Sequence, residues 1–256
     1  GWGDLIVTTS REVLGFFGTG RGFGPFQYLM QVVPGPDAGA DGGAASSGAT
    51  IAAGATVDRN GDGLSDVAIG TPIPESPLFF VLGGAEGAFG GFDPIIPAQP
   101  VRTAAERFAS GDFDGDGLAD TAFVTTQDGK PAVCVLRATE PEAAKVACFV
   151  PEAAPSGFAA SITACDLEGD GRDEILVGSS SGAIHVLRSS DSELTATPIT
   201  TEHGARITGI HPGRPGPAVW AATRSDGSSI AVFKGTTQVT TLSPVAQADR
   251  FGRWIR

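Results

Sequence analysis

Long hydrophobic runs are missing from this sequence. Although 41% of its 256 residues are hydrophobic, no stretch approaches the roughly 18 apolar residues that a membrane-spanning helix needs. Apolar residues also fail to recur at helical spacing over three turns. We therefore expect a globular chain with a sizeable core, no direct membrane insertion and no long helices.

Positive charge is scarce as well. The 17 lysines and arginines are outnumbered by 29 aspartates and glutamates, which gives a formal net charge of −12. Such a charge repels the phosphate backbone of nucleic acids and the surface of anionic lipids. We therefore expect no nucleic-acid partner.

Signatures of catalysis and of zinc binding are also lacking. The three histidines, His185, His203 and His211, are scattered without the short spacing of a zinc site. The sequence contains no G-x-S-x-G nucleophile motif. Paired carboxylates occur only in three acidic loops, where a metal ion would hold them ionised. We expect that the protein is not an enzyme.

Glycine and proline, by contrast, are abundant. The 37 glycines and 18 prolines form short clusters between brief apolar runs such as "LFFVL", "AVCVL" and "EILVG". This pattern is typical of short strands joined by turns. The sequence therefore predicts an all-β fold.

A nine-residue acidic loop occurs three times. The copies "DRNGDGLSD", "DFDGDGLAD" and "DLEGDGRDE" begin at Asp58, Asp112 and Asp166, so consecutive copies start 54 residues apart. Each copy has an oxygen-bearing side chain at loop positions 1, 3, 5 and 9 and a glycine at position 6. A constant period over two steps marks an internal repeat.

The loops predict a site for a hard divalent cation. Alternate positions of a tightly turning loop can all direct oxygen atoms inward, and position 7 usually adds a backbone carbonyl. Calcium fits better than magnesium because it accepts many ligands in flexible geometry. We expect about three Ca²⁺ ions, with the third loop weakest because glutamates lengthen two of its arms. The predicted ligands are Asp58, Asn60, Asp62, Leu64 and Asp66; Asp112, Asp114, Asp116, Leu118 and Asp120; and Asp166, Glu168, Asp170, Arg172 and Glu174.

Two other interpretations of the loops are less favoured. An EF-hand needs a glutamate at position 12 and flanking helices, whereas position 12 is Ile69, Phe123 or Val177 and apolar strand-like segments follow. Asp and Gly also favour ordinary turns without any metal. Three copies in register make that explanation improbable.

The repeat resembles the FG-GAP repeat. The resemblance is carried by the D-x-D-x-D-G-x-x-D loop, the apolar strand after it and the phenylalanine-containing segments before it, "ERFASGDFDGDG" and "SGFAASITACDLEGDG". FG-GAP repeats build the N-terminal β-propeller of integrin α-subunits and occur in many bacterial surface proteins. The resemblance implies blades of four antiparallel strands, with calcium between strands 1 and 2. The period agrees with one such blade.

The repeat predicts a single β-propeller domain over residues 1–256. The expected blades are 249–256 plus 1–33, 48–100, 101–155, 156–203 and 204–248, with a flexible linker at 34–48. The first blade joins the two ends because "GWGD" and "DRFGRWI" match complementary parts of one repeat. A ring of about five blades and a piece of a larger propeller both stay open. The fifth blade lacks the acidic loop and should bind no calcium.

Two cysteines are expected to face each other in the third blade. If Arg137 pairs with Lys145, Cys134 lies directly opposite Cys148 on the neighbouring strand, close enough for a disulfide. Two buried thiols are an equally weighted alternative. Cys165 stays unpaired in both cases.

The resemblance implies an extracellular or cell-surface binding and adhesion module. Extracellular calcium modules bind the ion weakly, with Kd of roughly 10⁻⁴ to 10⁻³ M. Because strands alternate in direction, the calcium loops share one rim, and a protein or glycan ligand is expected on the opposite rim. Alternatives are a lectin and an accessory propeller of a secreted polysaccharide- or lipid-degrading enzyme. The candidate ligand loops are Pro72–Pro77, Gln127–Lys130, Ser179–Gly182 and Arg224–Gly227.

Overall fold

The computed structural model describes residues 5–8, 12–19, 21–31, 52–70, 78–84, 89–95, 107–138, 146–190, 193–199, 201–210 and 216–243. Its regular elements are all β-strands. No helix capable of crossing a membrane occurs within these ranges. The expected linker at 34–48, the loop Pro72–Pro77, His211 and the C-terminal segment 249–256 lie outside the described residues.

The strands form five antiparallel sheets, one with three strands and four with four. The first sheet contains β1 (Leu5–Thr8), β2 (Glu12–Thr19) and β3 (Gly22–Gln31). The second contains β4 (Ala52–Val57), β5 (Asp66–Gly70), β6 (Leu78–Gly83) and β7 (Phe89–Ile95), and the third β8 (Phe108–Gly111), β9 (Asp120–Gln127), β10 (Lys130–Leu136) and β11 (Ala147–Phe149). The fourth contains β12 (Ser161–Cys165), β13 (Glu174–Gly178), β14 (Ile184–Ser189) and β15 (Leu194–Ile199), and the fifth β16 (Arg206–Ile210), β17 (Val219–Thr223), β18 (Ile230–Lys234) and β19 (Thr237–Leu242).

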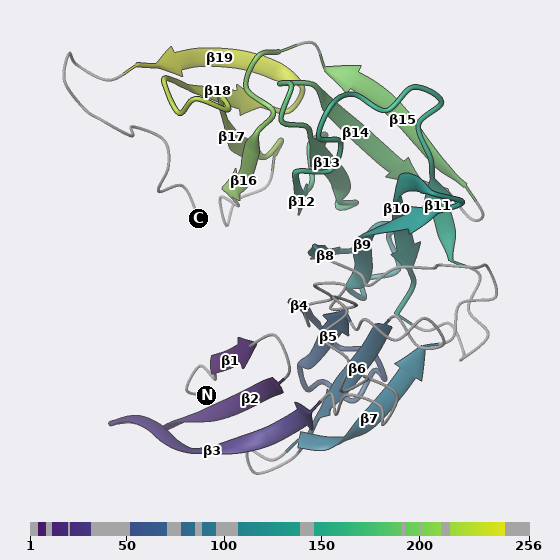
Figure 1. The fold of residues 1–256 in the computed structure, drawn as a ribbon, viewed down its shortest axis with the longest axis vertical. Helices are drawn as coiled ribbons and strands as arrows, with labels where there is room; N and C mark the ends of the chain where they lie inside the picture. The colour runs from purple at the N-terminus through teal and green to yellow at the C-terminus, as the bar shows by residue number, and fades with distance from the viewer. Residues whose placement is uncertain are drawn as a thin grey trace, which may run out of the picture.

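The sheets follow one another along an arc, with their first strands on its inner side (Figure 1). The strands β4, β8, β12 and β16 contact each other in series, and β1 contacts β4. Within each sheet the strands pair in chain order. This radial arrangement of four-stranded antiparallel sheets is that of a β-propeller.

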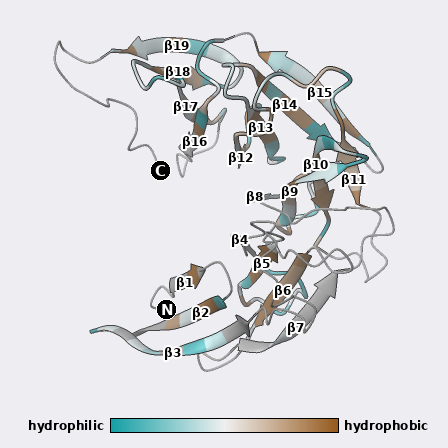
Figure 2. Cartoon of the chain, viewed as in Figure 1, coloured by the Kyte–Doolittle hydropathy of each residue, from teal (hydrophilic) through white to brown (hydrophobic). Residues whose placement is uncertain are grey.

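Apolar clusters between neighbouring sheets hold the blades together. The second strands β5 and β13 are buried on both faces because sheets pack on either side of them. Burial decreases outward, and β19 is exposed along its whole length. In Figure 2 strand β6, much of which is buried, is mostly brown, whereas the exposed outer strand β19 is paler. In the last of these clusters the Trp220 ring stacks on Phe233 at a centroid distance of 4.0 Å.

The predicted cysteine pair is present as a disulfide. Cys134 of β10 lies opposite Cys148 of β11 in the strand register, and the two sulfur atoms are bonded. The structure therefore favours the disulfide over two free thiols. Cys165 is free and buried, and burial raises the pKa of its thiol to about 12.

Candidate calcium loops and ligand rim

Each acidic loop connects the first and second strands of its sheet. Residues 58–66 join β4 to β5, residues 112–120 join β8 to β9, and residues 166–174 join β12 to β13. A strand rather than a helix follows every loop, which excludes the EF-hand. Because all three loops leave the same end of the first strand of their sheet, they lie on one rim of the propeller.

The aspartate at position 1 organises the turn. In the second loop its carboxylate accepts hydrogen bonds from the backbone N–H groups of Gly115, Asp116 and Gly117, at 2.7, 3.1 and 2.9 Å. The carboxylate of Asp166 makes the three equivalent contacts in the third loop. The loop shape is therefore maintained by its own side chains, as in Asx turns.

Two glycines per loop adopt left-handed backbone conformations. The expected one is at position 6, where Gly117 has a φ of +85°. The other is at position 4, and the sequence interpretation had not singled it out: Gly115 has a φ of +83°. A Cβ atom on Gly115 would lie 2.7 Å from Nε of Arg172, which belongs to the next blade. In the second and third loops, where Gly169 likewise lies against Gly216, the glycine at position 4 therefore also allows neighbouring blades to approach.

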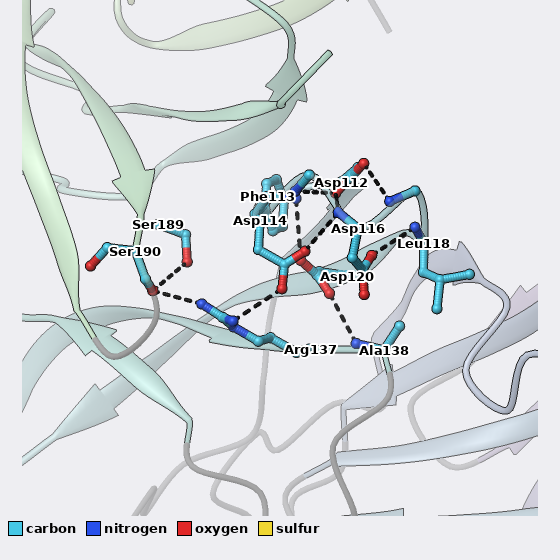
Figure 3. A network of polar contacts seen from close by, with 12 residues as sticks. Asp112, Phe113, Asp114, Asp116, Leu118, Asp120, Arg137, Ala138, Ser189 and Ser190 are labelled. Atoms are coloured by element: carbon cyan, nitrogen blue, oxygen red, sulfur yellow. Dashed lines mark hydrogen bonds and ion pairs between the residues drawn. The ribbon is translucent and has the colours of Figure 1, made fainter. Parts of the chain in front are cut away.

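The second loop gathers three carboxylates. Asp112, Asp114 and Asp116 each offer an oxygen atom, and these atoms lie within 4.8 Å of one another (Figure 3). This is the one such group of three within the part of the chain that the structure describes. Close carboxylates repel each other unless a cation is present. The donor set of hard oxygens in a flexible loop fits calcium.

The position 9 carboxylates are buried and face the protein. Asp120 is 1% exposed and accepts hydrogen bonds from the N–H groups of Phe113 and Ala138, at 3.2 and 2.9 Å. Asp66 and Glu174 likewise accept from the N–H at loop position 2. Burial raises the pKa of Asp120 to about 7 and also raises the pKa values of Asp66 and Glu174. Position 9 ties the loop to the core and is not part of the three-carboxylate group.

The first loop combines carboxylates with an amide. The Asn60 side-chain oxygen accepts the N–H of Asp62, and its nitrogen donates to the Asp62 carboxylate at 2.9 Å. The Asp58 carboxylate accepts N–H groups from Asp62 and Gly63. This loop thus keeps the shape of the second loop with one fewer negative charge.

The third loop contains an ion-pair network. Arg188 contacts Glu168 at 2.7 Å and Glu174 at 3.2 Å. Two of the four side chains predicted to bind calcium in this loop therefore already have a cationic partner. The carboxylates of Asp166, Glu168 and Asp170 do not form a group like that of the second loop.

Two of the candidate ligand loops meet at a cavity on the opposite rim, the ligand rim. The cavity has a volume of about 330 Å³ and lies between the fourth and fifth sheets. It is open and mostly polar, and Arg224 in its lining forms ion pairs with Glu202 and Asp226. Its lining residues are Ser180, Ala205, Arg206, Thr223, Arg224, Ser225 and Gly227.

The family comparison agrees with the loop geometry. Residues 58–123, which span the first two acidic loops, match the FG-GAP-like repeat. The chain carries an FG-GAP-like repeat. The resemblance to the FG-GAP family expected from the loops is thereby confirmed.

Solved structures confirm the propeller fold. The chain is similar to BBS1N in a crystal structure of its complex with ARL6DN, soaked with lead, at a TM-score of 0.58 and 12% identity over 94% of this chain and 63% of that chain. It is also similar to the Dos1 propeller, at a TM-score of 0.54 and 12% identity over 97% of this chain and 59% of that chain. The chain thus spans about three fifths of each of these structures. No curated protein matches it.

Proposed function

We propose that the protein is a calcium-stabilised FG-GAP β-propeller that acts as a non-catalytic binding or adhesion module outside the cell. The calcium assignment is supported above all by the three carboxylates of the second loop. Asp112, Asp114 and Asp116 would hold the ion, with the carbonyl of Leu118 at position 7. The Asp120 carboxylate at position 9, which accepts two backbone N–H groups in the core, would anchor the loop. The ion would cancel the repulsion between the carboxylates and tie β8 to β9.

The binding role is supported by the cavity on the ligand rim. Two loops expected to contact ligand, Ser179–Gly182 and Arg224–Gly227, both contribute residues to it. Loops on a rigid scaffold commonly carry recognition residues. The similar BBS1N structure is a complex with another protein, ARL6DN. We therefore propose a protein ligand at this cavity.

A lectin is the second candidate. Its support is the polar lining of the cavity, which offers hydroxyl groups from Ser180, Thr223 and Ser225. None of the described lining residues is aromatic, although aromatic rings on such loops would favour sugar binding. A protein ligand is therefore preferred.

An enzymatic role has little support. His203 Nε2 lies 2.8 Å from the hydroxyl of Ser229, which resembles half of a catalytic dyad. However, Ser229 is only 7% exposed, and Thr201 rather than a carboxylate contacts the other ring nitrogen. We assign this pair a structural role.

The proposed extracellular setting is supported by the disulfide bond. Disulfides such as Cys134–Cys148 persist in oxidising compartments. Weak calcium sites would also be filled at the millimolar calcium concentration outside cells.

A cavity-blocking variant tests the binding role. Arrays of extracellular proteins and of glycans are probed with the wild-type protein in calcium-containing buffer, and binding is then repeated with Ser225→Trp. The matched control is Thr240→Trp, which places the same ring on the exposed outer strand β19 of the fifth sheet, outside the lining of the cavity. We expect Ser225→Trp to abolish binding to a protein spot and Thr240→Trp to preserve it. Equal binding by both variants would exclude the cavity, and selective loss of a glycan signal would favour the lectin.

A further inference from the structure

In the third loop a side chain of the protein lies against the acidic groups. Arg188 of β14 places Nη2 2.7 Å from Glu168 at position 3 and Nε 3.2 Å from Glu174 at position 9. One guanidinium group thus contacts two of the four side chains that were expected to hold calcium. Such fixed, charge-assisted contacts are characteristic of arginine.

The second loop has an arginine at the equivalent position but a different geometry. Arg137 follows Val135 and Leu136 just as Arg188 follows Val186 and Leu187. Arg137 contacts the position 3 carboxylate, Asp114, at 3.0 Å, and its other nitrogen donates to a backbone carbonyl in the next blade, that of Ser190. It leaves the second-loop carboxylates together within 4.8 Å.

The length of the position 3 side chain accounts for the difference. Asp114 is short, so its carboxylate stays over the loop and also accepts the N–H of Asp116. Glu168 is longer by one methylene, and its carboxylate reaches outward to Arg188. In the second sheet, which carries the first loop, the equivalent of Arg188 is Gly83, which has no side chain to compete with a cation.

A second arginine reinforces the positive charge beside the third loop. A cavity of about 160 Å³ there is lined by carboxylates of this loop and by Arg172 as well as Arg188. A divalent cation approaching from this side would meet two guanidinium groups. To bind it, Glu168 and Glu174 would have to leave Arg188. Glu174 is only 5% exposed, so leaving Arg188 would deprive a nearly buried carboxylate of its cationic partner, which is costly.

We propose that Arg188 takes the place of calcium in the third loop. The first and second loops then bind one ion each, and the third is a metal-independent copy in which Arg188 is the counter-ion of Glu168 and Glu174. This inference rests on the proposed calcium binding and revises the expected number of ions from three to two. The third loop, in the fourth sheet, would thus keep its shape when calcium is withdrawn.

Calcium titration of the wild-type protein and of Arg188→Gln tests the proposal. In isothermal titration calorimetry we expect the wild type to bind two calcium ions. We expect Arg188→Gln to bind three, because this variant lacks the guanidinium group that contacts both glutamates. The matched control is Arg137→Gln in the second loop, which should stay at two. Three ions in the wild type, or two in a folded Arg188→Gln variant, would overturn the proposal while leaving calcium binding intact.

Two further variants keep the test independent of the folding of Arg188→Gln. Asp116→Asn in the second loop should lower the stoichiometry from two to one, whereas the equivalent Asp170→Asn in the third loop should leave it at two. A loss of one ion in Asp170→Asn would contradict the role of Arg188. A wild-type protein that binds no calcium would overturn both the proposed function and this inference.

Discussion

Asp112 and Asp173 are joined by two reciprocal hydrogen bonds across a blade boundary. The Asp173 carboxylate accepts the N–H of Asp112 at 3.0 Å, and the N–H of Asp173 donates to the carbonyl oxygen of Asp112 at 2.8 Å. The first residue of the second loop is therefore fixed by the eighth residue of the third. At the next boundary the backbone bond recurs, because the N–H of Ala218 donates to the carbonyl oxygen of Asp166, without a carboxylate partner in return.

This contact predicts that Asp173→Ala destabilises the protein. The substitution leaves the half-buried N–H of Asp112 without its carboxylate partner, which should lower the free energy of unfolding by about 1–3 kcal/mol. Urea unfolding measures the change. The control is Glu152→Ala at an exposed position, where a change within about 0.5 kcal/mol is expected. Equal stability of the two variants would show that the contact contributes nothing.

The surroundings of His185 predict that the protein loses stability in mild acid. Its ring lies near Phe149 and Phe158, at centroid distances of 6.3 and 5.6 Å, and its buried Nδ1 has no hydrogen-bond partner among the described residues. Burial lowers its pKa below 6.5. Protonation therefore favours the unfolded chain, and the contribution of this residue to stability is lost as pH falls below 6.5.

The variant His185→Leu should remove the part of the pH dependence of stability that comes from His185. Unfolding free energies of wild type and variant are compared between pH 7.5 and 5.5, so that the other titrating groups cancel. We expect the unfolding free energy of the wild type to fall relative to that of the variant as the pH is lowered. A difference that is constant over this range would contradict a half-buried His185 that stays neutral in the folded protein.

The disulfide predicts sensitivity to reductant. Cys134 and Cys148 are 14 residues apart in sequence, and a cross-link closing a loop of this size contributes about 3 kcal/mol. The double variant Cys134→Ser, Cys148→Ser should unfold at correspondingly lower urea concentration, and reductant should no longer affect it. When the wild-type protein is unfolded without reductant and alkylated, mass spectrometry should find the label on Cys165 and on neither of the other two cysteines. Labelling of all three cysteines would refute the disulfide.

Local features of the sequence predicted much of this structure. The loops from Asp58, Asp112 and Asp166 were identifiable because their aspartates and glycines act within nine residues, through Asx turns and left-handed glycines. The pairing of Cys134 with Cys148 followed from strand register over a short hairpin. Both depend on neighbours in sequence.

Contacts between blades could not be predicted in this way. Arg59 donates to the carbonyl groups of Arg137 and Ala138, 78 and 79 residues away, and Asp173 reaches Asp112 over 61. Such contacts depend on how the sheets pack. The same is true of Arg188, whose sequence neighbours resemble those of Arg137 although its partners differ. The cavity on the ligand rim likewise arises only where two blades meet.

The most direct test of the account is thermal unfolding of the wild-type protein in calcium, in magnesium and in EDTA. We predict that the Tm rises with calcium concentration and falls in EDTA. Magnesium should not replace calcium, because the loops offer many flexible oxygen ligands rather than a rigid octahedral site. At a calcium concentration a hundredfold above Kd, each independent site should contribute about 2.7 kcal/mol. An identical Tm in all three buffers would contradict the calcium-stabilised propeller.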